Sequence, residues 1–243
     1  MVQAPLQAAL SGPTLVRLLA RLAEADVSEP QASLADRLSQ WLGWTDAIAL
    51  STALGAPPDP ARAGAAQALD REDAALVVTA RSALTKMITR ACAPANARRG
   101  ARENAEAAPP ADFAEFRQDY LSIQQAMETE IGQLRKRLRA RLAAHTPALA
   151  RLAAVDAIME RSLGAREQRL LASVPALLAT YFERLRRAAQ PTPDGAGACA
   201  DEAPAAPGAW LAAFRKEMQS ALLAELDIRF QPVQGLLAAL RAR

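Results

Sequence analysis

The sequence is poor in cysteine, glycine and aromatic residues, and each shortage excludes a class of protein. Its 243 residues include 2 cysteines, 11 glycines and 4% aromatic side chains. Cys92 and Cys199 are too few for a disulfide framework and lack the paired spacing of a zinc site, so we expect two free thiols in a reducing compartment. The scarcity of aromatic and β-branched runs argues against a β-rich fold.

Motifs that carry catalytic or cofactor chemistry are also missing. The sequence has no glycine-rich phosphate loop, no HExxH, no CxxC, no GxSxG and no aspartate-rich metal loop. Its one histidine, His145, stands at the expected end of a long basic helix, where a cation stabilises the helix dipole. These absences predict a protein that is not an enzyme and uses no cofactor and no metal.

Long apolar runs are absent as well. No stretch approaches the roughly 20 apolar residues of a membrane span, and the N-terminus lacks the pattern of a signal peptide. The net charge of +3, from 29 basic and 26 acidic residues, is too close to balance for a protein that mainly coats nucleic acid or anionic lipid. We therefore expect a soluble, cytoplasmic protein.

The residues that are abundant, alanine, leucine and arginine, recur in helical periods and predict an all-α fold. In residues 1–93 we expect a small N-terminal helical bundle, with helices at about 13–25, 30–42, 45–55 and 70–91. The polar, proline-bracketed residues 94–110 read as a linker.

Two of the three tryptophans, Trp41 and Trp44, flank Gly43. We expect a corner between two helices in which Gly43 takes the left-handed conformation and Trp44 folds back against Leu38. A DNA-reading helix-turn-helix has the same outline. The helix that would read DNA, residues 46–54, contains no Arg or Lys, so the structural interpretation is favoured.

Residues 111–189 predict a long helical hairpin of coiled-coil type. From 112 to 142 the apolar residues recur at steps of three and four without a helix breaker. Thr146 and Pro147 then interrupt the pattern, and a second helical run follows to about residue 189. The chain either reverses here or kinks and continues, and we favour reversal. After a disordered linker at 190–208, we expect a C-terminal helix at 209–243.

A dense basic run lies near the end of the first long helix. It comprises Arg135, Lys136, Arg137, Arg139 and Arg141. Such a run can bind an acidic partner, phosphates or anionic lipid headgroups. The same helix begins with acidic residues, so a solvated face that matches the helix dipole is the competing interpretation. No aromatic residues interleave the run, which weakens the case for single-strand binding.

Two stretches carry a resemblance to a known family: SGPTLVRLLARLAEADVSEPQASLADRLSQWLGWTDAIALSTAL near the N-terminus and LLAELDIRFQPVQGLLAAL near the C-terminus. The chain resembles the bacterial proteins catalogued as domain of unknown function 3348. The likeness is one of pattern and carries no catalytic residues. It implies a genetic neighbourhood with proton-channel components of the ExbB/TolQ type and with OmpA-like peptidoglycan-binding proteins. The implied role is that of a cytoplasmic accessory to an envelope-spanning assembly.

The unbroken apolar faces and the missing site chemistry predict a non-enzymatic helical scaffold or adaptor. It would act through protein–protein interaction, with a partner protein or a second copy of the chain. The alternative is a nucleic-acid-associated protein that uses the basic helix 135–141, which predicts salt-sensitive binding. An enzyme with unfamiliar motifs ranks last, because it needs a concave pocket that sequence cannot locate.

Overall fold

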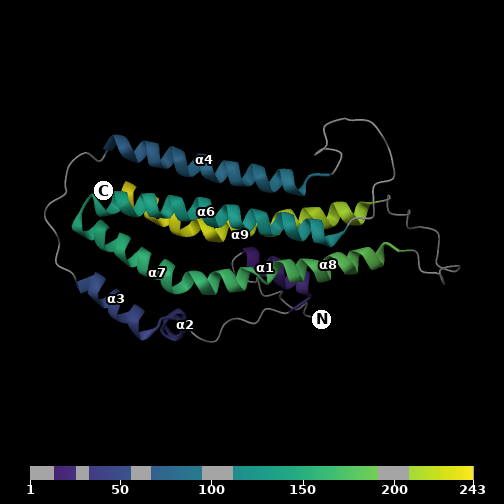
Figure 1. Cartoon of the computed structure of the whole chain (residues 1–243), viewed down its shortest axis with the longest axis horizontal. Helices are drawn as coiled ribbons and strands as arrows, with labels where there is room; N and C mark the ends of the chain where they lie inside the picture. Colours follow the sequence, from purple (N-terminus) through teal and green to yellow (C-terminus); the bar gives the residue numbers. More distant parts are fainter. Residues whose placement is uncertain (1–13, 26–32, 56–66, 95–111, 191–207, 243) are drawn as a thin grey trace, which may run out of the picture.

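The computed structural model describes residues 14–25, 33–55, 67–94, 112–190 and 208–242. Within these ranges every regular element is an α-helix, and the longest helices run roughly along the long axis of the molecule (Figure 1). The prediction of an all-α fold is confirmed. The two predicted linkers lie almost wholly outside the described residues.

The helices α6 (Phe113–Ala143) and α7 (Pro147–Leu171) form a hairpin. Thr146 caps α7, because its hydroxyl accepts a hydrogen bond from the backbone N–H of Leu149 at 3.3 Å. Pro147 occupies the first turn, where a missing N–H costs no helical hydrogen bond. The chain therefore reverses between the two helices, which lie side by side and antiparallel (Figure 1).

A further helix, α8 (Val174–Ala188), continues α7 past a bend. Pro175 lies in its first turn, so the bend occurs where proline is tolerated. Together α7 and α8 make one long bent arm, and both segments contact α6.

The C-terminal helix α9 (Ala209–Arg241) is the central helix, because it contacts α1, α4, α6, α7 and α8. Its largest buried apolar residues recur at steps of three and four along the whole length. They are Phe214, Met218, Leu222, Leu226, Phe230, Val233, Leu237 and Leu240. This is the apolar face expected of a C-terminal helix that packs on the hairpin.

The helices that precede the hairpin are distributed over the long ones. Helix α1 (Thr14–Ala23) packs on α8 and α9, α4 (Gln67–Cys92) on α6 and α9, and α3 (Trp44–Gly55) on α7. Figure 1 shows α3 and α4 on opposite sides of the hairpin. These contacts differ from the predicted separate N-terminal bundle, because the long helices cover the apolar faces of α1 and α4.

The corner between α2 (Leu34–Trp41) and α3 also differs from the expectation. Gly43 does not have a positive φ, and α3 begins directly at Trp44. Asp46, the third residue of α3, accepts a hydrogen bond from the backbone N–H of Gly43 at 3.2 Å, which is the back-bonding half of a capping box at the start of the new helix. The predicted left-handed glycine and the packing of Trp44 on Leu38 are therefore wrong, and Trp44 is 82% exposed.

Candidate functional site

The basic run of α6 meets carboxylates of α7 on one side. Nη2 of Arg135 lies 2.7 Å from Oδ1 of Asp156. Nη1 of Arg139 lies 2.9 Å from Oδ2 of Asp156 and 2.5 Å from Oε2 of Glu160. The two arginines and the two acids are each spaced i, i+4, so both helices present their charges at the same pitch. The result is a ladder of ion pairs that ties α6 to α7.

On the other side the run meets α4. Nε of Arg137 lies 2.7 Å from Oδ1 of Asp73, and Nε of Arg141 lies 3.1 Å from Oδ2 of the same residue. Asp73 is 1% exposed. A buried carboxylate needs this compensation, because desolvation of an unpaired charge is costly. The hydrogen bond to Asp73 raises the pKa of the Arg137 guanidinium.

These contacts give the basic run a structural role. Burial by itself lowers the pKa of Arg139, but hydrogen bonds to Glu160 and Asp156 raise the pKa overall, so the group stays charged. Lys136 is exposed. Binding of an outside anion by the run stays a prediction, and such an anion would compete with carboxylates of the same chain.

A buried polar network that sequence reasoning missed lies in the centre of the molecule. Glu225 of α9 is 0% exposed, and its carboxylate accepts hydrogen bonds from three different side chains. The hydroxyl of Tyr120 donates to it at 2.8 Å, and Nε2 of Gln124 donates at 3.0 Å. Nε of Arg229 donates at 2.9 Å. Three donors around one carboxylate offset the cost of burying its charge.

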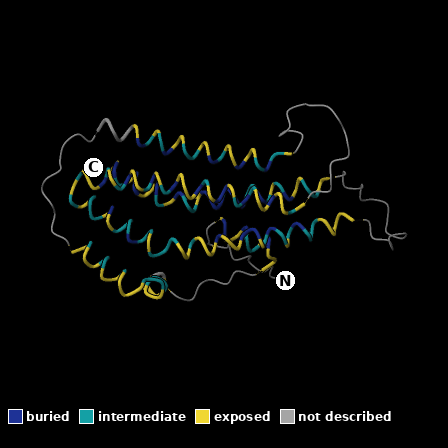
Figure 2. The backbone as a smooth tube through the Cα atoms, viewed as in Figure 1, coloured by how far each residue is buried: buried dark blue, intermediate teal, exposed yellow. Residues whose placement is uncertain are grey.

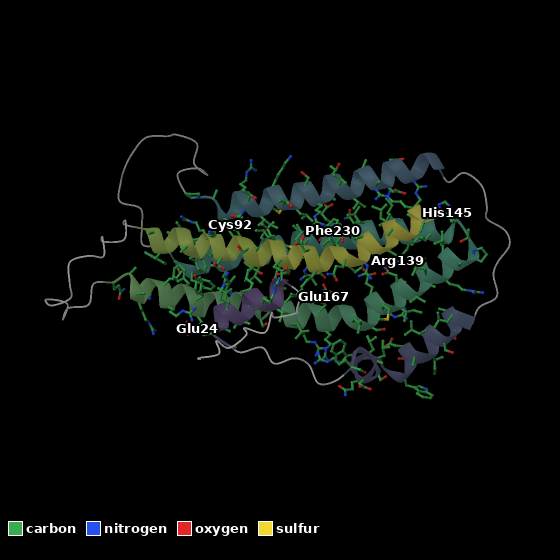
Figure 3. The ribbon with its side chains drawn as sticks, turned by 180° about the vertical axis from the view of Figure 1, so that it is seen from behind. Glu24, Cys92, Arg139, His145, Glu167 and Phe230 are labelled. Carbon is green, nitrogen blue, oxygen red and sulfur yellow. The ribbon has the colours of Figure 1, made fainter. Side chains whose placement is uncertain are left out.

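Arg229 extends the network from α9 to α7. Its Nη1 lies 3.6 Å from Oε1 of Glu167, which Figure 3 labels beside α9. The amide of Gln124 also donates to the backbone carbonyl of Leu171 at 3.1 Å, where α7 ends. One set of hydrogen bonds therefore holds α6, α7 and α9 in register.

A signal for this network exists in the sequence. Glu225 lies seven residues after Met218 and three after Leu222, which places a charge on the apolar face of the C-terminal helix. Tyr120 and Gln124 are spaced i, i+4 on the hairpin helix and share a face. A charge on an apolar stripe calls for polar partners on the facing helix.

The phenol of Tyr120 resists ionisation. Burial raises its pKa strongly, and the nearby charge of Glu225 raises it further. The raised pKa means that Tyr120 stabilises the fold fully below its ordinary pKa of 10.0 and that this contribution is lost as the pH rises above that value.

The exchange Tyr120→Phe tests this directly. Near neutral pH the free energy of unfolding of the variant should be lower than that of the wild type by about 1 to 3 kcal/mol, because a hydrogen-bond donor to buried Glu225 is lost. Above pH 10 the gap should shrink by about 1.4 kcal/mol per pH unit, because only the wild type then loses the Tyr120 contribution. Urea unfolding of both proteins between pH 7 and pH 11 measures the gap, and a gap that does not change above pH 10 contradicts the assignment.

Helix α3 presents apolar side chains to solvent. The α3 outer face, as we call it, consists of exposed residues at positions i, i+3, i+4, i+7 and i+10, which lie on one side of the helix: the apolar Trp44, Ala47, Ile48 and Leu54, and the small Ser51. Trp44 is 82% exposed, Ile48 51% and Leu54 64%. The face carries no charge, because the one charged residue of α3, Asp46, lies on the half-buried side. No residue of α3 is fully buried, as Figure 2 shows.

The neighbouring Trp41 has a different environment. It is half-buried, and the guanidinium of Arg166 from α7 lies 4.5 Å from the centre of its ring. This cation–π contact fastens α2 to the long arm. Of the two tryptophans at the corner, Trp41 therefore serves the fold, whereas Trp44 has an exposed ring.

Other candidate chemistry is sparse in the described part of the chain. No group of three or more His, Cys, Asp or Glu side chains there could hold a metal ion. None of the described helices combines the length and the apolarity that crossing a bilayer requires. Cys92 is a buried thiol at the end of α4, and Cys199 lies outside the described residues.

These features define a class of protein: a helical hairpin closed by a central C-terminal helix, with an apolar helix on its outside. Comparison of the sequence with known protein families then assigns the chain to one family. It belongs to the family described as "Protein of unknown function (DUF3348)", whose profile matches residues 1–242. No curated protein and no solved structure matches the chain.

Proposed function

We propose that the protein is a non-enzymatic helical adaptor that binds a partner protein through the α3 outer face. The observation that carries this proposal is the exposure of Trp44, Ile48 and Leu54 on one uncharged side of a single helix. Scattered apolar side chains are ordinary on protein surfaces, whereas a contiguous cluster with an aromatic anchor is typical of interaction sites.

The environment of α3 supports this proposal. Its inner side is half-buried against α7, which holds the helix in place without burying it. Trp44 and Ile48 are spaced i, i+4, so they form one ridge that fits the groove of another helix. Because the ridge lacks charge, a complementary partner presents an apolar helical surface rather than an acidic or basic one.

The family suggests where such a partner acts. Resemblance to this family implies a neighbourhood of envelope proton-channel components, so we place the adaptor on the cytoplasmic side of an envelope-associated proton-channel assembly. A second copy of the chain is the competing occupant of the α3 outer face. Nucleic-acid binding by the basic run from Arg135 to Arg141 is less favoured, because four of the five basic side chains in the run already pair with carboxylates of the same chain.

The triple exchange Trp44→Ser, Ile48→Ser and Leu54→Ser tests the proposal. Tagged protein is purified from the cells that make it, and the complex is sized by light scattering after gel filtration. We expect the wild type to retain a partner at fixed stoichiometry and the triple variant to lose it, because truncation of central anchors costs about 2 kcal/mol or more each.

A matched control exchanges exposed apolar residues elsewhere: Val78→Ser, Met87→Ser and Leu170→Ser. It should keep the partner. Both triple variants should melt within a few degrees of the wild type, because the exchanged side chains are solvent-exposed. Retention of the partner by the α3 variant, or its equal loss from the control, contradicts the proposal.

A further inference from the structure

Three arginines of α7 lie beside the start of α3. Arg161, Arg166 and Arg169 are all exposed. The guanidinium of Arg166 lies 4.5 Å from the ring centre of Trp41, the last residue of α2. Trp44 follows three residues later, and α3 packs on α7 from there (Figure 1). The arginines therefore border the end of the α3 outer face at which Trp44 lies.

These arginines are not neutralised by carboxylates of the described residues. None of the three forms an ion pair there, and Nε of Arg169 donates to the backbone carbonyl of Ala165 at 3.1 Å. Glu167, the one acid in residues 161–173, pairs with Arg229 of α9 at 3.6 Å. At about 100° per residue, each arginine lies about 100° or more around α7 from Glu167. The outer side of this part of α7 is therefore purely basic.

Helix α3 itself adds almost no charge to this surface. Among its 12 residues, Asp46 alone is charged, and its side chain is half-buried. The outer side of a surface helix is normally polar, and a helix that is apolar all round is typically covered on both sides. The surface that surrounds Trp44 and Ile48 therefore combines an apolar centre from α3 with a basic edge from α7.

We propose that the partner of the α3 outer face is an amphipathic helix of another protein, with acidic residues beside its apolar side. The apolar side covers Trp44 and Ile48, and the carboxylates pair with Arg161, Arg166 and Arg169. An apolar centre with a polar rim is the usual anatomy of an interface, and the guanidinium fork matches a carboxylate. This inference rests on the proposed adaptor function and adds the charge of the partner.

The same surface is less suited to two other occupants. In an isologous pair of copies the same patch lies on both sides, so a basic edge gains no carboxylate from the uncharged α3 outer face. An anionic membrane attracts arginine as well, but a helix that lies in the headgroup layer carries basic residues on its own polar face. Helix α3 carries none. An acidic partner helix fits both the apolar centre and the basic edge.

Peptide binding to the full chain tests the charge of the partner. Three fluorescent helical peptides share one apolar face of leucines and differ only in the flanking residues, which are Glu, Gln or Lys. By fluorescence anisotropy, the Glu peptide should bind about fivefold or more tightly than the Gln peptide, and the Lys peptide more weakly than both. The preference should disappear in about 1 M salt. Equal affinities, or no binding of the Glu peptide, overturn the proposal.

The double exchange Arg161→Gln and Arg169→Gln locates the basic edge and keeps the contact that Arg166 makes with α2. It should remove most of the preference for the Glu peptide. The matched control, Arg90→Gln with Arg117→Gln, removes the same charge from two exposed arginines of α4 and α6. It should keep the preference. An equal loss in both variants would mean that the peptide senses only the overall charge, which overturns the proposal.

Further outcomes separate this inference from the proposed function. The triple variant at Trp44, Ile48 and Leu54 should lose all three peptides, and peptides that still bind it contradict docking on α3 itself. Equal binding of the three peptides to the wild type, with none to the triple variant, overturns only the acidic partner. Phosphatidylglycerol vesicles that sediment the wild type but not the Arg161 and Arg169 variant would overturn a protein partner. A dimer that the triple exchange dissociates would overturn a partner other than a second copy.

Discussion

Replacing Glu225 by alanine should lower the free energy of unfolding by about 3 to 5 kcal/mol, the largest effect that we expect from any polar residue. The exchange leaves the hydroxyl of Tyr120 and the amide of Gln124 without their buried acceptor. It also removes the closest carboxylate from Arg229, whose side chain is 9% exposed. Urea unfolding followed by circular dichroism measures the loss.

A surface acid provides the comparison for Glu225. Glu183 pairs with Arg186 on α8 at 2.7 Å, and both side chains are more than one-third exposed. Glu183→Ala should change the stability by no more than about 0.5 kcal/mol, because solvent screens exposed pairs. A loss below about 1 kcal/mol for Glu225→Ala would mean that the network does not hold the bundle together.

Phe214→Ala should cost about 3 to 5 kcal/mol, because it removes a fully buried ring from the core. Phe214 is 0% exposed, and its ring centre lies 5.1 Å from that of Phe116 and 5.0 Å from that of Phe182. The three rings join α9 to α6 and α8. Thermal and urea unfolding should both report the loss.

Phe113→Ala is the matched exchange at the edge of the same aromatic cluster. Its ring centre lies 6.2 Å from that of Phe214, but the residue is only half-buried. The same chemical change should therefore cost less, because less surface returns to water and the gap can be filled by solvent. Equal losses in the two variants would contradict the placement of Phe214 at the centre of the core.

The hairpin was predictable because its signals are local. Apolar steps of three and four run to Leu142, and Thr146 with Pro147 marks a new helix start within a few residues. The partners of α1 and α4 were not predictable in the same way. An apolar stripe shows that a helix is covered, but several long stripes in this chain can cover it equally well.

Charge pairing shows the same limit. The i, i+4 spacing of Arg135 and Arg139 matches that of Asp156 and Glu160, and this match can be read from the hairpin once its register is known. Asp73 lies on a helix far away in sequence, so its capture of Arg137 depends on where α4 packs. From the sequence alone, the basic run therefore had no identifiable partner within the chain and could be interpreted as a solvent-exposed surface.

The prediction that Trp44 packs against Leu38 was wrong for a specific reason. The prediction needed a left-handed Gly43 to turn the chain, but Asp46 accepts a hydrogen bond from the N–H of Gly43 and the helix restarts without that turn. The indole is consequently left outside. The proposed function rests on this exposed Trp44, which the expected turn would have packed against Leu38.

The most direct test of partner binding through the α3 outer face is photo-crosslinking in living cells, with a benzophenone amino acid at position 44 or at position 136. The first probe reports on the α3 outer face and the second on the basic run. Position 44 should give one dominant adduct with a partner protein, and position 136 should give none of comparable yield. Adducts with nucleic acid or protein from position 136, with none from position 44, would contradict an adaptor that docks through α3.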